Sequence, residues 1–567
     1  MKLLSVHCDY IKFKALKKAL KNPEELPDER KKEIEVKECL VIFTAIEKKD
    51  EEYNELINKY IENIESIAKQ VHAKNLVLYP YAHLSSNLAS PDFALSVLKE
   101  AEKKLSKKFK VTRAPFGYYK EFELKCKGHP LSELSREITD KKTEEKSVEE
   151  KYDYKQLLRE ISKSKLDTSK LKGNDHRILG QRMNLFSFSD VAPGMVFWHN
   201  NGLIIFNELI SYWREEHVKS GYQEIKTPQI LDKKLWQISG HWEKYKENIF
   251  ISEYEKRTVA VKPMNCPGSM IVYKNTSHSY RDLPTRFAEL GIVHRQELSG
   301  VLAGLFRLIQ FTQDDAHIFC TDNQLEEEII KIIELIDKFY QLFNFPYHVE
   351  LSTRPAKKIG DEKIWDKAES ILEKVLKKRK MKFKINKEDG AFYGPKIDFH
   401  IKDSLNRTWQ LATIQLDFAM PERFDLTYIT DTNEEKRPII LHRVIYGSIE
   451  RFIGILLEHT NGHLPLWLAP IQVRIINFTD RNNKACENFL SELIKKDIRV
   501  DVDLTSEPLQ GKIKQAEIEK IPYIIVIGDK EEKSGDLAVR KKEKVSSIKK
   551  DKFIKKILRE IAEKSLD

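Results

Sequence analysis

The sequence predicts a multidomain α/β protein, and three observations lead to this fold class. The chain has 567 residues, whereas single domains usually hold about 100 to 200 residues. Short β-rich runs alternate with helical patterns near both ends, and one stretch of almost wholly charged and polar residues interrupts the chain. We therefore expect an N-terminal domain at residues 1–138, a charged linker at 139–175, a large central domain at 176–466 and a C-terminal domain at 467–567.

Composition and charge narrow the class of protein. The sequence is 41% hydrophobic and 33% charged, and no apolar run approaches the ~20 residues of a membrane-spanning helix, so we expect a cytoplasmic protein without a membrane partner. Six scattered cysteines cannot hold a fold of this size together by disulfides, which fits a reducing compartment where thiols are free to bind metal. The net charge of +10 fits a polyanionic partner such as RNA, and equally a Lys/Glu-rich surface adapted to heat.

Residues 1–138 carry the pattern of a small α/β domain. The runs LLSVHC, CLVIFTAI and NLVLYPYAHL predict strands, because apolar and β-branched residues dominate them. Between them, YNELINKYIENIESIAKQV has apolar residues at three- and four-residue spacing and predicts a helix. Residues 139–175 have little to bury, and we interpret them as a linker that is in part helical.

The C-terminal part returns to β/α alternation from Leu468 onward. IQVRIINF predicts a strand, the stretch around CENFLSELIKK a helix, and the almost fully apolar PYIIVIGD a buried parallel strand. The chain closes with KKDKFIKKILREIAEKSL, which predicts an amphipathic helix. Its apolar face is expected to consist of Phe553, Ile554, Ile557, Leu558 and Ile561.

Three polar motifs follow one another in the central part. They are YQEIKTPQIL at 222–231, with Pro228; RFAELGIVHRQELSGVLAGLFRLIQFTQDDAHIFC at 286–320, with Arg295; and GSIER at 447–451, with Arg451. In order and spacing they resemble motifs 1, 2 and 3 of the class II aminoacyl-tRNA synthetases. The resemblance implies a catalytic core built on an antiparallel sheet, ATP as a substrate with Mg²⁺ as its counterion, and a homodimer, because motif 1 forms the dimer interface in this class.

Three candidate metal ligands lie far apart in the chain: Cys266 in VKPMNCPGSM, His317 in QDDAHIF and His442 in IILHRVIYG. Taken singly, each has an ordinary alternative, since a lone Cys is usually a buried hydrophobe and a lone His a satisfied polar residue. Together with the three motifs they resemble threonyl-tRNA synthetases, in which Cys, His and His hold a catalytic zinc. The resemblance implies threonine and tRNA(Thr) as further partners and one Zn²⁺ per subunit.

A zinc site of this kind suits threonine for a chemical reason. Three protein ligands leave positions open to a substrate, and threonine offers an amino nitrogen and a β-hydroxyl, whereas isosteric valine lacks the oxygen. Serine keeps both groups and lacks only a methyl, a difference worth about 1 to 3 kcal/mol, so binding alone cannot exclude it. A second, hydrolytic site is therefore expected in the same protein or in a partner.

The resemblance also implies roles for residues around the metal. Asp315 would accept a hydrogen bond from the substrate hydroxyl, although a capping carboxylate is the alternative, and Gln313 and Tyr393 would meet the amino group beside Met264. Arg295 would bridge the substrate carboxylate and the α-phosphate, which are two negative groups that must be brought together. The remaining implied ATP-site residues are Glu297, Arg307, Phe311 as the adenine platform, Gln410, Gln415, Arg451 near a helix N-terminus, and Lys396 as a further catalytic residue.

Two segments of the N-terminal domain carry a second resemblance. YPYAHLSSNLA at 79–89 and APFGYYKEFELKCKGHPLSELSR at 114–136 resemble the editing domain of archaeal threonyl-tRNA synthetases, a fold similar to D-aminoacyl-tRNA deacylases. The residues implied there are His83, Lys120, Tyr119 and Glu133. A surface cation is the alternative for Lys120, and a helix N-terminal residue for Glu133. Hydrolysis of mischarged seryl-tRNA(Thr) is the implied activity.

The stretch DVDLTSEPLQGKIKQAEIEKIPYIIVIGDKEEKSGDLAVR resembles the class IIa anticodon-binding domain, with Glu531 and Arg540 as implied contacts to tRNA. Nine Lys/Arg face two acidic residues between Arg540 and Lys556, which suits phosphate binding or a solvated lysine-rich helix. Two rival functions stay open: a class II synthetase for another amino acid such as serine or proline, and a catalytically silent paralogue that only binds RNA.

Overall fold

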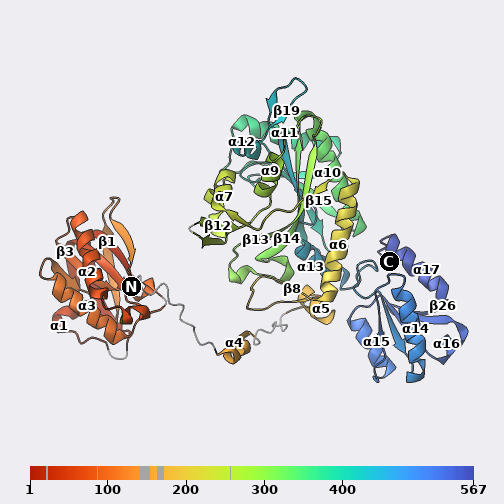
Figure 1. Cartoon of the computed structure of the whole chain (residues 1–567), viewed down its shortest axis with the longest axis horizontal. Helices are drawn as coiled ribbons and strands as arrows, with labels where there is room; N and C mark the ends of the chain where they lie inside the picture. The colour runs from red at the N-terminus through yellow and green to blue at the C-terminus, as the bar shows by residue number, and fades with distance from the viewer. Residues whose placement is uncertain (21–22, 86, 139–152, 162–170, 256, 567) are drawn as a thin grey trace. The chain divides into compact units, whose positions relative to one another are not determined.

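The computed structural model describes residues 1–20, 23–85, 87–138, 153–161, 171–255 and 257–566, and the chain divides into two compact units, Met1–Tyr152 and Asp153–Asp567 (Figure 1). Most of the predicted linker, at 139–152 and 162–170, lies outside the described residues. Between these stretches Tyr154–Ile161 forms helix α4. The last predicted linker residue, Asp175, belongs to a folded element, because its side chain caps helix α5 (His176–Arg182) by accepting a bond from Arg177 N at 2.9 Å.

The N-terminal unit is a six-stranded sheet in the order β4-β3-β2-β1-β5, with β6 also paired to β1. Strand β1 is antiparallel to β2, β5 and β6, whereas β2, β3 and β4 run parallel. The strands are β1 (Lys2–Lys18), β2 (Ile34–Ala45), β3 (Asn75–Pro80), β4 (Lys110–Arg113), β5 (Tyr118–Cys126) and β6 (Glu133–Glu137). The helices are α1 (Asp28–Lys31), α2 (Leu56–Gln70) and α3 (Pro91–Leu105).

Alternation along β2 shows how this sheet divides its two faces. Leu40 and Ile42 pack in one core with α2 and α3, while Val41 and Phe43 belong to a second core on the opposite face. On this second face, the side chains of Tyr79, Tyr81 and Phe122 line a cavity. A two-sided apolar pattern therefore explains why CLVIFTAI reads as a continuous hydrophobic run.

The central part of the second unit is an eight-stranded sheet in the order β16-β15-β17-β18-β21-β14-β13-β9. All its pairings are antiparallel except the two at its edges, β15–β16 and β13–β9. This confirms the predicted antiparallel catalytic sheet. The strands are β9 (Gln223–Glu224), β13 (Thr285–His294), β14 (Gln310–Cys320), β15 (Tyr347–Ser352), β16 (Phe383–Asn386), β17 (Lys396–Lys402), β18 (Thr408–Asp417) and β21 (Ile439–Val444).

The two faces of the central sheet differ in character. Ala316, Ile318 and Leu441 pack on one face in a large core with four helices, α6 (Asn200–Lys219), α10 (Asp322–Leu342), α11 (Glu362–Lys378) and α13 (Ile449–Thr460). The other face carries the alternate residues of β14, of which Gln313, Asp315 and His317 are polar and are flanked by Phe311 and Phe319. Only short helices such as α9 (Cys266–Lys274) and α12 (Ala419–Arg423) lie against it, in a smaller core. Side chains on this face are thus free to build a site.

The C-terminal part is a five-stranded sheet in the order β23-β22-β24-β25-β26, parallel between β23, β22 and β24 and antiparallel beyond. The strands are β22 (Val473–Asn477), β23 (Val500–Asp503), β24 (Tyr523–Ile527), β25 (Asp536–Lys541) and β26 (Lys544–Lys549), and the helices α14 (Asn483–Ile494), α15 (Leu509–Ile518), α16 (Asp529–Ser534) and α17 (Lys550–Ala562). The predicted face of α17 is wrong at Leu558, which stays 37% exposed, because Phe553, Ile554, Ile557 and Ile561 already complete the stripe on the core.

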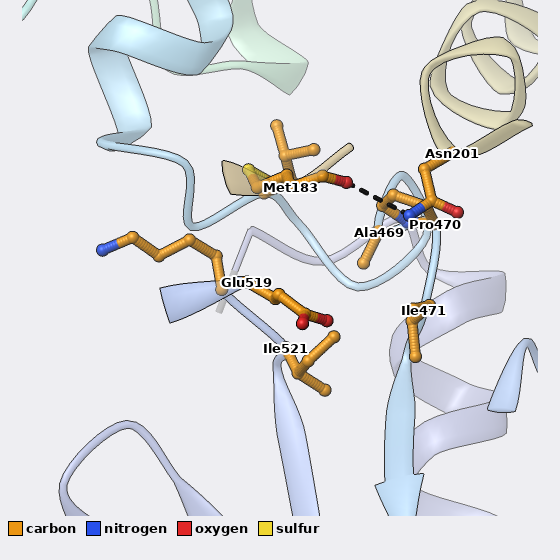
Figure 2. A pocket seen from close by; sticks show the side chains of 9 residues that line it. Met183, Asn201, Ala469, Pro470, Ile471, Glu519 and Ile521 are labelled. Atoms are coloured by element: carbon orange, nitrogen blue, oxygen red, sulfur yellow. Dashed lines mark hydrogen bonds between the residues drawn. The ribbon is translucent and has the colours of Figure 1, made fainter. Parts of the chain in front are cut away.

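A small pocket marks the point where the chain passes from the central sheet into the C-terminal part (Figure 2). Asn201 of α6 donates to Met183 O at 3.1 Å on one side, and Glu519 and Ile521 line the other. Its volume of about 10 Å³ holds about one water molecule, so the pocket is a small packing gap and not a ligand site.

Among the described residues, no helix has the length and apolar character needed to cross a membrane.

Candidate active site and metal centre

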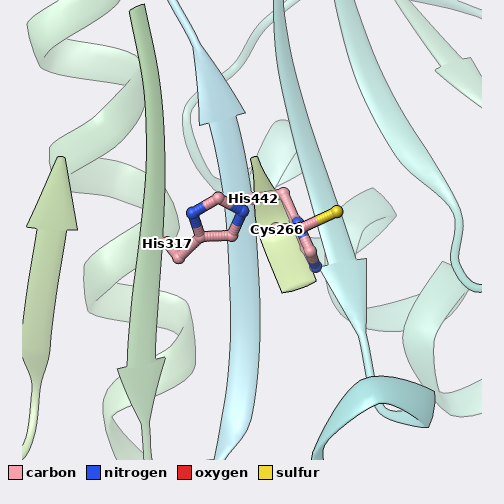
Figure 3. A group of neighbouring side chains, drawn as sticks. All are labelled: Cys266, His317 and His442. Atoms are coloured by element: carbon pink, nitrogen blue, oxygen red, sulfur yellow. The ribbon is translucent and has the colours of Figure 1, made fainter. Parts of the chain in front are cut away.

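The three predicted metal ligands come together on the polar face of the central sheet (Figure 3). His317 on β14 and His442 on β21 are direct cross-strand partners, so both side chains point to the same side. Cys266 is the first residue of α9. One potential ligand atom from each residue lies within 4.8 Å of the other two. Pairing of strands and the start of one helix therefore assemble a cluster from residues that are distant in sequence.

The chemistry of this cluster fits a divalent cation that prefers sulfur and nitrogen, above all zinc. All three residues are buried, and the Nε2 atom of His317 has no hydrogen-bond partner, which is costly for a buried nitrogen unless it serves as a ligand. Burial raises the pKa of the Cys266 thiol and lowers that of His317. The carboxylate of Asp417 accepts a bond from His442 Nε2 at 2.8 Å, the kind of partner that orients ligating histidines.

The predicted threonine-site residues surround the cluster. Gln313 and Asp315 precede His317 at two-residue intervals on β14 and share its face. Asn265 Nδ2 donates to Asp315 Oδ2 at 3.3 Å, and burial raises the pKa of Asp315 to about 6. The ring of Tyr393 lies 5.5 Å from that of His442.

Two neighbours shape this side of the site. A Cβ at Gly394 would lie 1.7 Å from Leu416 O, so only glycine lets the loop of Tyr393 approach β18 this closely. Met264 contacts His241, whose Nε2 is 2.9 Å from the Met264 sulfur. Burial, together with the charges of His442 and Arg295, lowers the pKa of His241 to about 3. His241 was not predicted as part of the site.

A cavity of about 380 Å³ opens beside the cluster on the same face. Arg295 and Arg451 face it together with Gly447 and Ser448, at the N-terminus of α13, whose dipole favours anions. Burial and the charges of Arg295 and Arg307 lower the pKa of Arg451, so three guanidinium groups gather around the space. Arg295 also lies 5.1 Å from the ring of Phe311. Of the predicted ATP residues the cavity is lined by Arg295, Glu297, Arg307, Phe311, Gln410 and Arg451, together with Gln313.

The structure does not bring Gln415 and Lys396 to the wall of this cavity. His317, His442, Gln415 and Lys396 are successive cross-strand partners on β14, β21, β18 and β17, so Gln415 lies next to the metal cluster. Its Nε2 donates to Gly394 O at 3.3 Å. Lys396 Nζ lies 2.6 Å from Asp398 Oδ2, and Asp398 Oδ1 in turn accepts a bond from Gln410 Nε2. The lysine thus reaches the cavity through Asp398, a buried residue that the sequence did not single out.

Asp314 is a further residue that was not predicted from the sequence. It lies on β14 between Gln313 and Asp315 but faces the opposite side and is fully buried. Its carboxylate accepts bonds from the backbone N–H groups of Ile445, Tyr446 and Gly447 at 2.9 to 3.1 Å. It therefore holds the turn that precedes α13. The only signal in the sequence was a carboxylate at a core-facing strand position.

A buried ion pair supports the segment that leads to Cys266. Lys262 Nζ lies 2.8 Å from Glu289 Oε1 and 2.9 Å from Thr227 Oγ1, and Thr227 N also donates to Glu289. These contacts join the proline end of the 222–231 motif, strand β13 and the strand before Cys266. The sequence signal for this pair was a charged residue, Lys262 or Glu289, among apolar neighbours, since a buried charge needs a partner.

In the N-terminal unit, a cavity of about 460 Å³ is lined by three of the four predicted editing residues, His83, Tyr119 and Lys120. Burial lowers the pKa of Lys120 to about 8, and its Nζ lies 5.1 Å from the ring centre of Tyr79. Glu133 does not line this cavity. It lies on the short strand β6, where it accepts a contact from Cys126 Sγ at 3.5 Å.

In the C-terminal part, the two predicted tRNA contacts each have a local partner. Glu531 accepts a bond from Gly528 N at 3.0 Å and caps α16, and Arg540 on β25 pairs with Glu517 at 3.3 Å.

Family models match three successive parts of the chain. Residues 1–138 match the archaea-specific editing domain of threonyl-tRNA synthetase, 248–460 the class II core domain of the synthetases for G, H, P, S and T, and 472–560 an anticodon-binding domain.

The chain is 53% identical over 397 residues to a threonine–tRNA ligase of Caldanaerobacter subterraneus subsp. tengcongensis, covering 70% of this chain and 62% of that one. It is 52% identical over 395 residues to a threonine–tRNA ligase of Carboxydothermus hydrogenoformans, covering 69% and 62%. The chain thus spans about 62% of the length of these curated relatives.

Among solved structures, one described as the RNA binding domain of threonyl-tRNA synthetase from Cryptosporidium parvum is 39% identical, with a TM-score of 0.66, and the match covers 68% of this chain and 98% of that one. Three successive family matches, and a relative covered almost completely at this identity, leave one assignment. The chain belongs to the threonyl-tRNA synthetase family.

Proposed function

We propose that the chain is a threonine–tRNA ligase that activates threonine with ATP, transfers it to tRNA(Thr) and hydrolyses mischarged seryl-tRNA(Thr) in its N-terminal unit. The observation that carries this proposal is the joint position of the Cys266–His317–His442 cluster and the arginine-lined cavity on one face of one sheet. A site for a small hydroxy amino acid thus adjoins a site for a triphosphate. The names and domains of the relatives support the same activity.

Activation requires a carboxylate to attack the α-phosphate of ATP and release pyrophosphate. Arg295 lines the cavity and its charge also acts on the thiol of Cys266 in the metal cluster, so it can bridge the two negative groups and lower their repulsion in the transition state. Arg451 and Arg307 hold the triphosphate tail, and Mg²⁺ accompanies ATP as its counterion. Phe311 and Glu297 offer a stacking surface and an acceptor for the adenine and its amino group.

Threonine is held by residues on the metal side. Zinc, when bound to Cys266, His317 and His442, supplies open coordination positions for the amino and hydroxyl groups of the amino acid. Asp315 accepts a hydrogen bond from the hydroxyl, and Gln313, Tyr393 and Met264 complete the pocket around the amino group. Lys396 acts on the pocket from strand β17 through its ion pair with Asp398, and Gln415 acts from strand β18, where it lies beside His442.

An exchange assay separates this proposal from its rivals. ATP–pyrophosphate exchange with a panel of amino acids is expected to respond to threonine alone. Exchange with serine or proline would make the chain another class II synthetase. Absence of exchange with every amino acid, in protein that still binds RNA, would favour a silent paralogue.

Metal analysis tests the cluster directly. We expect about one zinc per chain in purified protein, and loss of that zinc in Cys266→Ala, His317→Ala and His442→Ala. Protein devoid of metal, or full activity in all three variants, contradicts the zinc proposal.

Editing is assigned to the cavity at His83, Tyr119 and Lys120, with Glu133 acting from outside its wall. Removing residues 1–138 should leave threonylation intact and let seryl-tRNA(Thr) accumulate. Unchanged clearance of serine after this truncation would overturn the assignment.

For the C-terminal part we propose that Glu531 and Arg540 contact the anticodon region of tRNA. Glu531→Ala and Arg540→Ala should therefore raise the KM for tRNA and leave pyrophosphate exchange unaffected.

A homodimer is proposed from the first motif. Val218 lies shortly before this motif and Ile230 within it. They are 75% and 63% exposed, which suits burial against a second copy. Light scattering should give twice the chain mass, and a monomeric mass would contradict the proposal.

A further inference from the structure

We propose that His176 is a positioning residue of the ATP site, which holds the loop at Leu305 and Phe306 in place and through it orients Arg451. This inference rests on the proposed ATP-binding function. His176 is the first residue of α5, is 1% exposed and is not among the residues that line the ATP cavity. Both of its ring nitrogens nevertheless make hydrogen bonds, one to helix α13 and one to the loop between β13 and β14, and both of these segments contribute to the site.

The first end of this connection is the C-terminal part of α13. His176 Nδ1 donates to Glu458 Oε1 at 2.6 Å, and His176 N donates to the same oxygen at 3.0 Å. The other oxygen of Glu458 pairs with Arg407 at 2.7 Å. Glu458 is buried, so these partners fix its carboxylate and, with it, the ring of His176.

The second end is the loop between β13 and β14. Leu305 N donates to His176 Nε2 at 3.0 Å, and the rings of His176 and Phe306 lie 4.2 Å apart. Gly304 allows this approach, because its φ is +54° and a Cβ there would lie 2.2 Å from His176 Nε2. Nε2 accepts and Nδ1 donates, so the two contacts together select one tautomer of the ring.

The loop passes this constraint to the triphosphate site. Phe306 O accepts a bond from Arg451 Nε at 2.9 Å, and both Leu305 and Phe306 line the cavity. A displaced Phe306 carbonyl would release the guanidinium that faces the phosphates. His176 thus acts on Arg451 indirectly, through the backbone carbonyl of Phe306.

A metal is the competing interpretation, because one potential ligand atom from each of Asp175, His176 and Glu458 also lies within 4.8 Å of the other two. The geometry argues against it. His176 Nε2 faces a backbone N–H that a cation would have to displace, and Nδ1 already donates to the carboxylate. Unlike His317, this histidine has no nitrogen left without a partner.

The test compares His176→Ala, His176→Gln and His459→Ala in the full chain. His459 is a matched control, because it follows Glu458 on helix α13 and one of its ring nitrogens also accepts a backbone bond. This bond comes from Ser404 N to His459 Nδ1 at 3.0 Å, far along the chain from the loop at Leu305. The readouts are the KM for ATP, the KM for threonine and kcat in pyrophosphate exchange, with the ATP Kd from calorimetry. Circular dichroism verifies that each variant is folded.

We expect His176→Ala to raise the ATP KM and Kd about tenfold, with the threonine KM and kcat changed less than about threefold, because contacts to the triphosphate tail are equal in ground and transition states. His176→Gln should recover much of the loss, since its carbonyl can accept from Leu305 N, and His459→Ala should match the parent. Unchanged ATP affinity in folded His176→Ala overturns the proposal, as does an equal loss in His459→Ala. If His176→Ala does not fold, His176→Leu takes its place, because leucine fills the space and makes neither ring bond. Parental ATP affinity in folded His176→Leu would overturn the proposal.

The direct ATP Kd keeps this test separate from the proposed function. A chain that binds ATP but exchanges no pyrophosphate with threonine would refute the proposed amino acid, while the effect of His176 on the ATP Kd would still be measured.

Discussion

At the scale of single residues, the burial of Lys120 makes its charge depend on pH near the physiological range. Burial lowers its pKa to about 8, so the side chain is a cation below that pH and neutral above it. An ammonium group would stabilise the oxyanion that forms when an aminoacyl ester is hydrolysed. We therefore predict that enzymatic hydrolysis of seryl-tRNA(Thr), corrected for spontaneous hydrolysis, falls as the pH rises through about 8.

The measurement is the deacylation rate on either side of that pKa. Lys120→Arg should flatten the profile, because a guanidinium stays charged throughout this range. A rate that rises with pH would mean that the neutral amine acts as a base, and a parental rate in Lys120→Ala would remove Lys120 from the mechanism.

At the scale of elements, the turn before α13 depends on one carboxylate. Asp314 accepts bonds from three successive backbone N–H groups, and an amide offers a single acceptor oxygen and would present its own N–H₂ to these donors. We predict that Asp314→Asn lowers the stability of the Asp153–Asp567 unit by about 1 to 3 kcal/mol, the cost of buried groups without partners. It should also raise the KM for ATP, because Gly447, Ser448 and Arg451 move with the turn.

Urea unfolding of the unit and exchange kinetics measure both effects. Asp322→Asn is a suitable control, since Asp322 is an exposed carboxylate shortly after the same strand that pairs with exposed Lys367 at 2.5 Å. Equal loss of stability in the two variants would contradict the role given to the turn.

At the scale of the whole molecule, Arg499 ties the C-terminal part to the central sheet. Its guanidinium donates to Trp467 O at 2.6 Å, Ala469 O at 2.9 Å and Glu208 Oε1 at 2.6 Å, and Glu208 lies on α6. We predict that Arg499→Ala leaves pyrophosphate exchange unchanged and lowers kcat/KM for tRNA about three- to tenfold, because charge-assisted bonds of this kind contribute about 1.5 to 3 kcal/mol and part of that is recovered by relaxation.

Lys564→Ala is the matched control. Lys564 also links the two parts, through Glu215 at 3.1 Å, but that pair is partly exposed and contributes about 0 to 1 kcal/mol. A loss of exchange activity in Arg499→Ala would mean that the arginine supports the catalytic core itself.

The antiparallel core was predicted from the resemblance of three motifs to the class II synthetases, and the sheet confirms it. The same resemblance implied the three ligands and the ATP residues, and their roles stay predictions. Gln313, Asp315 and His317 alternate on β14, and a period of two places them on one face of that strand. The stripe on α17 was predicted for the same reason and was wrong only at Leu558, where neighbouring residues on the helix compete for one core.

What the sequence by itself determined was therefore the class of fold and the residues that each motif offers. Only the tertiary structure decided which distant groups meet: His442 with Asp417, Lys396 with Asp398, Asp314 with the turn before α13, and His176 with Leu305. It also decided that Glu133 and Gln415 stand apart from the cavities to which they had been assigned. The physical reason is that strand register and loop approach are set by packing over the whole sheet, and a buried polar residue reveals its partner only when that packing is complete.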